Sequence, residues 1–148
     1  MYESEYDYYT GSSTTTGFDG EGQITSAINY VVSDNLPVVY YVEGHNEVSI
    51  PDALNDRIQK ANLDLQSLNL LTSESVPEDA ACILLNSPEK DYSAQEADKV
   101  IEYLENGGKA IILTDYIGDA LENYNRILSS YGIEVVNGIV IETDNNMY

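Results

Sequence analysis

Residues 36–47 have the sequence Leu36-Pro37-Val38-Val39-Tyr40-Tyr41-Val42-Glu43-Gly44-His45-Asn46-Glu47. The first seven residues are apolar, β-branched or aromatic, and such a run is typical of a buried strand. A polar loop follows at once, and it contains the only histidine of the chain together with two carboxylates. In open α/β sheets the loops after the carboxyl ends of strands bind ligands, so a small-molecule site is expected at this loop if the protein has one.

The charge of the chain excludes some classes of partner. Its 148 residues are enough for one domain with a sizeable core, and they carry 26 acidic against 6 basic residues, a formal net charge of -20. Nucleic-acid binding is therefore disfavoured, because neutralising phosphates requires Lys and Arg. Docking on an anionic lipid surface is disfavoured for the same reason, whereas the acidity suits a soluble module in an outer aqueous space.

The single cysteine and the single histidine limit the chemistry further. Cys82 alone allows neither an internal disulfide nor a zinc site built from several cysteines, and one histidine restricts metal sites to carboxylate-rich ones. No apolar run reaches the roughly 20 residues of a membrane span. The first residues lack the basic region of a signal peptide. The residues that follow Met1 are acidic and tyrosine-rich and resemble the interior of a protein sequence, so we expect the chain to be part of a longer protein.

Two regions are expected along the chain. Residues 1–22 combine an acidic, tyrosine-rich piece with a Gly/Ser/Thr tract from Gly11 to Gly17, which predicts a linker or surface loop. We assign them to the end of a preceding domain, with Tyr8-Tyr9-Thr10 as a candidate edge strand. Residues 23–148 are expected to form one α/β domain.

Helical and strand patterns alternate through this domain. Apolar residues at helical spacing, together with capping signals such as Ser93-Ala94-Gln95-Glu96, predict helices over 23–33, 50–62, 93–106 and 119–131. Strands are predicted over 36–42, 63–70, 81–85, 109–114 and 133–141, and a loop over 72–80. The continuously apolar run 81–85 predicts a strand buried on both faces, with Cys82 as a packed core thiol.

This alternation predicts a flavodoxin-like fold, in which a mostly parallel sheet carries helices on both faces in three layers. Right-handed crossovers favour the strand order 2-1-3-4-5. That order places strand 36–42 beside strand 81–85. The loops Glu43–Glu47 and Asn86–Asp91 then flank the topological switch point, where such sheets bind ligands.

An ordered set of short motifs resembles the soluble domain of the GldG-like family, auxiliary components of ABC-type transport systems first linked to gliding motility. Together the motifs cover nearly all of residues 18–141. In chain order they are Phe18-Asp19-Gly20-Glu21, Ile24-Thr25-Ser26-Ala27-Ile28-Asn29-Tyr30-Val31, Val38-Val39-Tyr40-Tyr41-Val42-Glu43-Gly44-His45-Asn46-Glu47, Val76-Pro77-Glu78-Asp79-Ala80, Asn86-Ser87-Pro88, Asp91-Tyr92-Ser93 with Glu96, Tyr103-Leu104-Glu105-Asn106-Gly107-Gly108-Lys109 and Tyr131-Gly132-Ile133-Glu134.

The resemblance implies a flavodoxin-like fold similar to class I glutamine amidotransferases. It also implies a parent membrane protein that holds this domain outside the cytoplasm and works with the permease and ATPase subunits of an ABC transporter. The family usually has Gly-His-Gly-Glu where this chain has Gly44-His45-Asn46-Glu47. Asn adopts a left-handed backbone more readily than most residues, so the loop shape is expected to be kept.

Amidotransferase-type catalysis needs a nucleophile on a sharp strand-to-helix turn within reach of a histidine. The residues after strand 81–85 are Asn86-Ser87-Pro88, and a proline beside Ser87 disfavours such a turn. A carboxylate-rich cation site of Glu43, His45, Glu47 and Asp115 is an alternative, but a histidine that orders its own loop by hydrogen bonds is favoured. No glycine-rich phosphate loop precedes a helix, so no flavin, nucleotide or other cofactor is expected.

The sequence therefore predicts a non-catalytic extracytoplasmic binding or assembly module of an ABC-type transport complex. The alternative is a hydrolase or amidotransferase-like enzyme that uses the His45 loop. No catalytic or metal-binding residue is assigned, and a small molecule or glycan remains a conceivable ligand of unknown identity. The candidate binding residues are Glu43, Gly44, His45, Asn46, Glu47, Asn86, Ser87, Pro88 and Asp115.

Overall fold

The structure is a computed structural model, and it describes residues 2–18, 20–33, 35–116, 121–136, 138 and 141. The chain divides into two compact units. Unit 1 comprises Met1–Pro37 and Pro51–Asp64, and unit 2 comprises Val38–Ile50 and Leu65–Tyr148. Among the described residues, no helix combines the length and the apolarity that a bilayer crossing needs.

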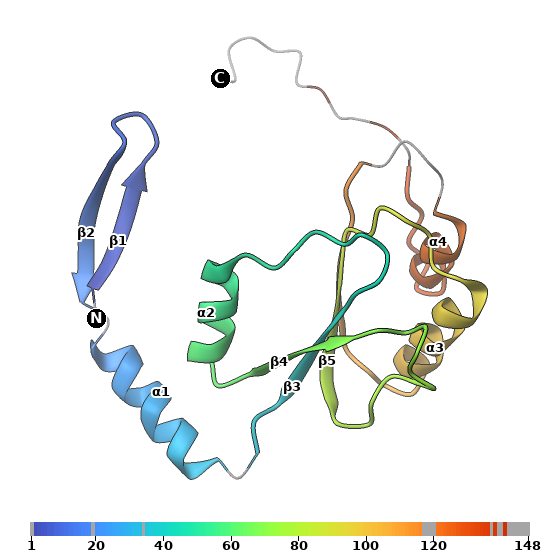
Figure 1. Cartoon of the computed structure of the whole chain (residues 1–148), viewed down its shortest axis with the longest axis horizontal. Helices are drawn as coiled ribbons and strands as arrows, with labels where there is room; N and C mark the ends of the chain where they lie inside the picture. The colour runs from blue at the N-terminus through green and yellow to red at the C-terminus, as the bar shows by residue number, and fades with distance from the viewer. Residues whose placement is uncertain are drawn as a thin grey trace. The chain divides into compact units, whose positions relative to one another are not determined.

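Unit 1 begins with a two-stranded antiparallel hairpin, β1 (Tyr2–Asp7) and β2 (Ser12–Phe18) (Figure 1). The tract predicted as a linker or loop is thus largely a strand, because its run of β-branched threonines favours extended backbone. Tyr8-Tyr9-Thr10, a predicted edge strand, is instead part of the turn, which ends at Gly11 with a φ of 66°. The assignment of residues 1–22 to a preceding domain stays a prediction.

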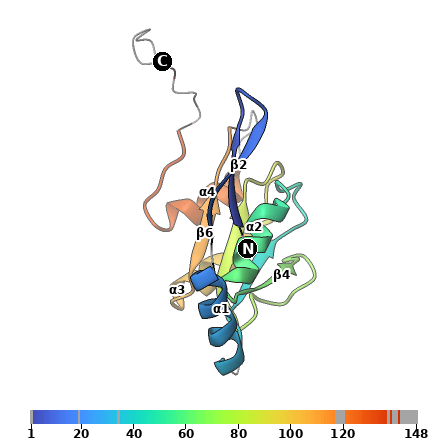
Figure 2. The same cartoon turned by 90° about the vertical axis from the view of Figure 1, so that its left-hand side faces the viewer.

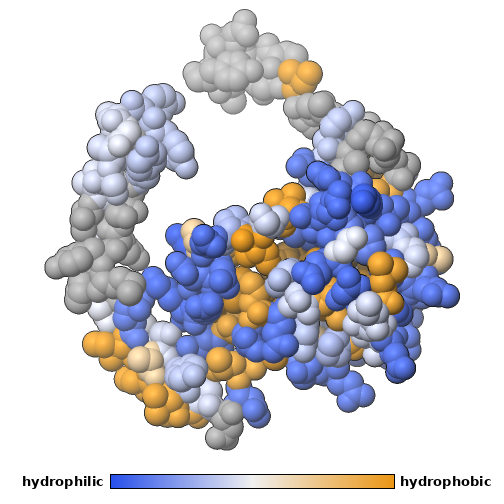
Figure 3. All heavy atoms as spheres, viewed as in Figure 1, coloured by the Kyte–Doolittle hydropathy of each residue, from blue (hydrophilic) through white to orange (hydrophobic). Residues whose placement is uncertain are grey.

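Helix α1 (Gly20–Val32) confirms the predicted first helix, but its apolar stripe is exposed rather than buried. Ile24, Ile28 and Val31 are 64%, 58% and 80% exposed, and Figure 3 shows apolar surface along this helix. Within unit 1, a different face of α1 meets the end of α2 (Asp52–Lys60). The Ser26 hydroxyl donates to the Lys60 carbonyl (2.6 Å), and the Asn62 side-chain amide donates to the Ser26 carbonyl (2.8 Å).

A four-stranded parallel sheet of order β4-β3-β5-β6 organises unit 2. Its strands are β3 (Val38–Val42), β4 (Asp64–Leu68), β5 (Ala80–Asn86) and β6 (Ala110–Leu113). The predicted order 2-1-3-4 is confirmed for these four strands, and the architecture is consistent with the predicted flavodoxin-like three-layer class. Residues 71–79 form the predicted loop without a helix.

The core of unit 2 lies on one face of this sheet, under α3 (Ala94–Glu105) and α4 (Glu122–Ser129), which Figure 2 shows on the same side. Side chains alternate between the faces of a strand, so Ile83 and Leu85 of β5 enter this core and are fully buried. Cys82 points to the other face and is only partly buried, which corrects the prediction of a packed core thiol. Burial raises the pKa of the Cys82 thiol, and this weakens it as a nucleophile.

Two predicted elements extend into regions that the structure does not describe. Residues 133–136 are irregular and exposed, so the predicted strand 133–141 is not found there; residues 137, 139 and 140 lie outside the described part. The predicted helix 119–131 corresponds to α4, and its first positions, 119 and 120, also lie outside that part.

Helices α3 and α4 begin with different capping arrangements. Ser93 and Glu96 form the predicted capping box of α3. Helix α4 has no cap from its own N-cap side chain, and Asp91 supplies one from the loop after β5. The Asp91 carboxylate accepts hydrogen bonds from the backbone N–H groups of Asn123 and Tyr124, at 3.0–3.1 Å. Asp91 therefore ties the candidate loop to the start of α4.

We predict that Asp91→Ala lowers the free energy of unfolding by about 1–2 kcal/mol, because two N–H groups of α4 lose their acceptor. Asp98→Ala is the matched control, since its pairing with Arg126 (2.9 Å) is an exposed ion pair worth about 0.5 kcal/mol. Urea denaturation of both variants measures the difference. Equal losses of stability would show that Asp91 does not act as a cap.

Candidate functional site

Two loops meet at the carboxyl end of the sheet, as the predicted strand order requires. One follows β3 and the other follows β5, and these two strands are paired neighbours. The His45 carbonyl accepts hydrogen bonds from the N–H groups of both Glu89 and Lys90, at 3.0 Å. The Asn86 side-chain amide donates to the Val48 carbonyl (2.6 Å), and the Val48 N–H donates to the Asn86 carbonyl (3.1 Å). The loops therefore form one paired surface.

The His45 ring is buried between two carboxylates, and its side chain is only 7% exposed. Its Nδ1 lies 3.3 Å from Glu47 Oε1. Its Nε2 lies 3.2 Å from Oε1 and 3.3 Å from Oε2 of Glu96, on helix α3. The Tyr92 ring packs edge-on against the imidazole, with 4.2 Å between ring centroids. This cluster anchors the first loop to the helix that follows the second.

Glu96 is a site residue that the sequence did not reveal. The capping box predicts that its side chain lies at the start of α3, and its Oε2 indeed accepts from the Ser93 N–H at 2.8 Å. Its contact with His45, which lies 51 residues earlier in the chain, cannot be recognised from the local sequence around either residue. Burial favours the neutral acid, but the Ser93 hydrogen bonds and the neighbouring His45 outweigh it and lower the pKa of Glu96.

Glu47 shapes the backbone of the first loop as well as contacting His45. Its Oε2 accepts from the N–H groups of Gly44 (3.0 Å) and His45 (2.8 Å), so one carboxylate closes the turn. Gly44 has a φ of 125°, and a Cβ there would lie 3.3 Å from the Asn69 amide nitrogen. Asn46 has a φ of 57°, which is the left-handed backbone expected for this position.

Tyr92 completes the buried part of the cluster. Its side chain is 2% exposed, and its hydroxyl has no hydrogen-bond partner within the described part of the chain. Burial raises the pKa of Tyr92, and the nearby Glu47, Tyr124 and Glu96 raise it further. The phenol therefore stays protonated and is no candidate for a nucleophile.

The remaining predicted residues fall into two groups. Ser87 and Pro88 belong to the paired loops: Ser87 has a φ of 49° and donates its N–H to the Leu113 carbonyl (2.9 Å), and Pro88 is buried. Asp115 follows β6, is exposed, and accepts a hydrogen bond from the neighbouring Tyr116 N–H (2.7 Å). The described contacts thus join residues 43–48 to residues 86–90 and leave Asp115 in a local turn.

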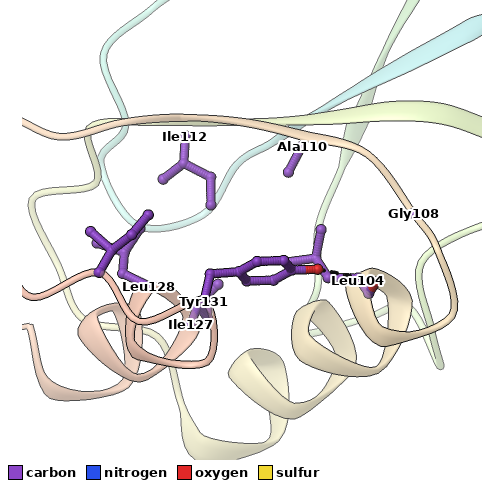
Figure 4. A pocket seen from close by; sticks show the side chains of 8 residues that line it. Leu104, Gly108, Ala110, Ile112, Ile127, Leu128 and Tyr131 are labelled. Atoms are coloured by element: carbon purple, nitrogen blue, oxygen red, sulfur yellow. Dashed lines mark hydrogen bonds between the residues drawn. The ribbon is translucent and has the colours of Figure 1, made fainter.

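This arrangement restricts what the loops can do chemically. Both ring nitrogens of His45 face carboxylates. Within the described ranges, no group of three or more His, Cys, Asp or Glu side chains could hold a metal ion. This applies also to the predicted alternative of Glu43, His45, Glu47 and Asp115. A cavity of about 190 Å³ lies elsewhere, between β6 and helices α3 and α4 (Figure 4). Its lining is mainly apolar and includes Leu104, Ile112 and Tyr131.

Fold and sequence together define an accessory domain of a transport system. Residues 36–148 match the family described as an ABC-type uncharacterized transport system, and the chain belongs to this family, whose components are auxiliary to transport. The match does not distinguish the GldG-like subgroup within this family. No curated protein sequence matches the chain.

A solved structure titled mmIFT52 N-terminal domain is similar to this chain, with a TM-score of 0.60 and 22% sequence identity. The similarity covers 74% of this chain and 51% of that one, so this chain spans about half the length of the solved domain. At this identity the similarity supports the fold and carries no statement about function.

The lowered pKa of Glu96 predicts a pH-dependent contribution to stability. The pKa of a glutamate in the unfolded chain is about 4.3. A carboxyl whose pKa is lower in the folded protein stabilises the fold at pH values above that unfolded pKa. It loses this contribution as the pH falls through the pKa of the folded state. Glu96→Gln should therefore be less stable than the wild type at pH 7. The difference should shrink as the pH falls below about 4.

Chemical denaturation across this pH range measures the difference, and Glu102→Gln on the exposed face of α3 is the control. Its stability should follow the wild type at every pH. A difference between Glu96→Gln and the wild type that stays constant from pH 7 to pH 3 would contradict the account of the cluster.

Proposed function

We propose that this domain is a non-catalytic binding or assembly module of an ABC-type transport complex, and that the paired loops carry its recognition surface. The family is auxiliary to transport, which supports an accessory role rather than a reaction. We further propose a GldG-like parent membrane protein that holds the domain outside the cytoplasm and joins it to permease and ATPase subunits. The strong negative charge supports this location, as an acidic surface suits an outer aqueous space.

One observation carries the recognition role: a buried cluster of His45, Glu47 and Glu96 fixes a loop whose outer residues are exposed. His45 and Glu96 lie inside, whereas Glu43, Asn46 and Glu89 lie at the surface. The Asn46 side-chain amide donates to Glu89 Oε2 across the two loops, at 3.4 Å. A surface held rigid in this way loses little conformational entropy when a partner binds, which favours affinity.

The catalytic alternative finds little support in this geometry. A histidine base needs a free ring nitrogen directed at a nucleophile, and the two ring nitrogens of His45 instead lie against Glu47 and Glu96. Ser87 precedes a buried proline in a loop rather than the first turn of a helix. A small molecule or glycan that binds the paired loops would therefore be recognised rather than converted.

The double variant Glu43→Lys/Glu89→Lys tests this function in the full-length protein. Both side chains are exposed, so we expect an unchanged melting temperature, whereas recovery of the permease in affinity purification should fall at least about tenfold. Transport by the intact system should fall with it.

Glu102→Lys/Glu105→Lys on α3 is the matched control, because it changes the net charge equally on an exposed helix face. It should leave recovery and transport unchanged. Normal recovery and transport for both double variants would exclude the paired loops as the recognition surface. Equal losses for both would indicate an effect of charge alone.

A further inference from the structure

Strand β6 is the last strand on its side of the sheet that the described residues form. The carbonyls of Lys109 and Leu113 accept hydrogen bonds from Ile83 and Ser87, so the odd-numbered residues of this segment pair with β5. The N–H and C=O groups of one residue in a strand point to the same side. Within β6, those of Ala110 and Ile112 are therefore directed to the outer edge of the sheet.

Neither a charge nor a proline interrupts β6, although the strand is only four residues long. Natural edge strands are interrupted by charges, prolines or bulges, whereas residues 110–114 contain no charge and no proline. Ile111 and Leu113, which share the sheet face away from α3 and α4, are 53% and 47% exposed. One basic residue, Lys109, precedes the uncharged run, and one acidic residue, Asp115, follows it; both are exposed.

We propose that β6 pairs with β6 of a second copy of this chain, antiparallel and about a two-fold axis at Ile112. The two four-stranded sheets then join into one continuous sheet. In this register Ile112 lies opposite Ile112 of the second copy. Ile111 lies opposite Leu113 of the second copy, and Lys109 lies opposite Asp115 of the second copy.

Three features agree with this register. Ala110 and Ile112, whose backbone groups point outward, fall in hydrogen-bonded pairs, opposite Thr114 and Ile112 of the second copy. Ile111 and Leu113 fall in the closer non-hydrogen-bonded pairs, where exposed apolar side chains cover one another. Lys109 and Asp115 meet at both ends on the same face with opposite charges. A shift of two residues in either direction would break the charge match.

The net charge of -20 per copy opposes this association. One strand per copy is also a small interface, so the dimer is expected to be weak and to form as concentration rises. Moderate salt should favour it by screening the overall repulsion. Under these conditions, a strand edge without complementary charges would not favour one pairing register over another.

Charge-exchange variants test the register by sedimentation velocity over a range of concentrations at physiological ionic strength. Lys109→Glu and Asp115→Lys should each raise the dimer dissociation constant by about fivefold or more, because each places like charges opposite one another twice. The double variant Lys109→Glu/Asp115→Lys restores opposite charges in the same register, and its constant should return to within about twofold of the wild type.

Glu78→Lys is the matched control for Asp115→Lys, because it is exposed, changes the net charge equally, and lies outside β6. It should leave the dimer unchanged or strengthen it slightly. A monomer at every concentration would overturn the proposal, as expected if a strand of the same chain covers the edge. A stronger dimer for Asp115→Lys, or no recovery in the double variant, would also overturn it.

Discussion

The arrangement of the candidate site depends on the burial of one histidine between two carboxylates. His45 lies between Glu47 of its own loop and Glu96 of α3, and Tyr92 closes the cluster. Polar and ionisable side chains are costly to bury without partners, and here both ring nitrogens of His45 lie against carboxylates. The loop after β3 is therefore fixed to the helix after β5, and its outer residues are presented in a defined conformation.

The same contacts support our proposal that this loop recognises a partner and does not catalyse a reaction. Glu96 has three contacts at once. Its carboxylate accepts a hydrogen bond from the Ser93 N–H and lies against the His45 ring, and its own backbone N–H donates to the Ser93 hydroxyl. A histidine held on both sides is positioned by its neighbours and is unavailable to a substrate at the surface. Membership of a transport-auxiliary family agrees with an accessory role.

Much of this fold could be predicted from the sequence, because its signals are local. The apolar run of β3, the Ser93–Glu96 capping box and the alternation of elements fixed the strand order of the described sheet. The His45–Glu96 contact could not be predicted, since it joins positions 51 residues apart. The burial of Cys82 was overestimated, because an apolar run does not show that one face of even an inner strand such as β5 is only partly covered. The Thr-rich tract was misjudged because glycine and serine pointed to a loop while threonine favours strands.

Hydrogen exchange at the first loop tests the central account most directly. Glu47 Oε2 accepts from the N–H groups of Gly44 and His45, and the His45 carbonyl accepts from Glu89 and Lys90. These four amides lie in or beside exposed loops, yet the account predicts exchange at neutral pH as slow as that of the sheet core, because opening them requires the buried cluster to separate. Exchange as fast as in a free loop would contradict it, and His45 would then be an ordinary loop residue.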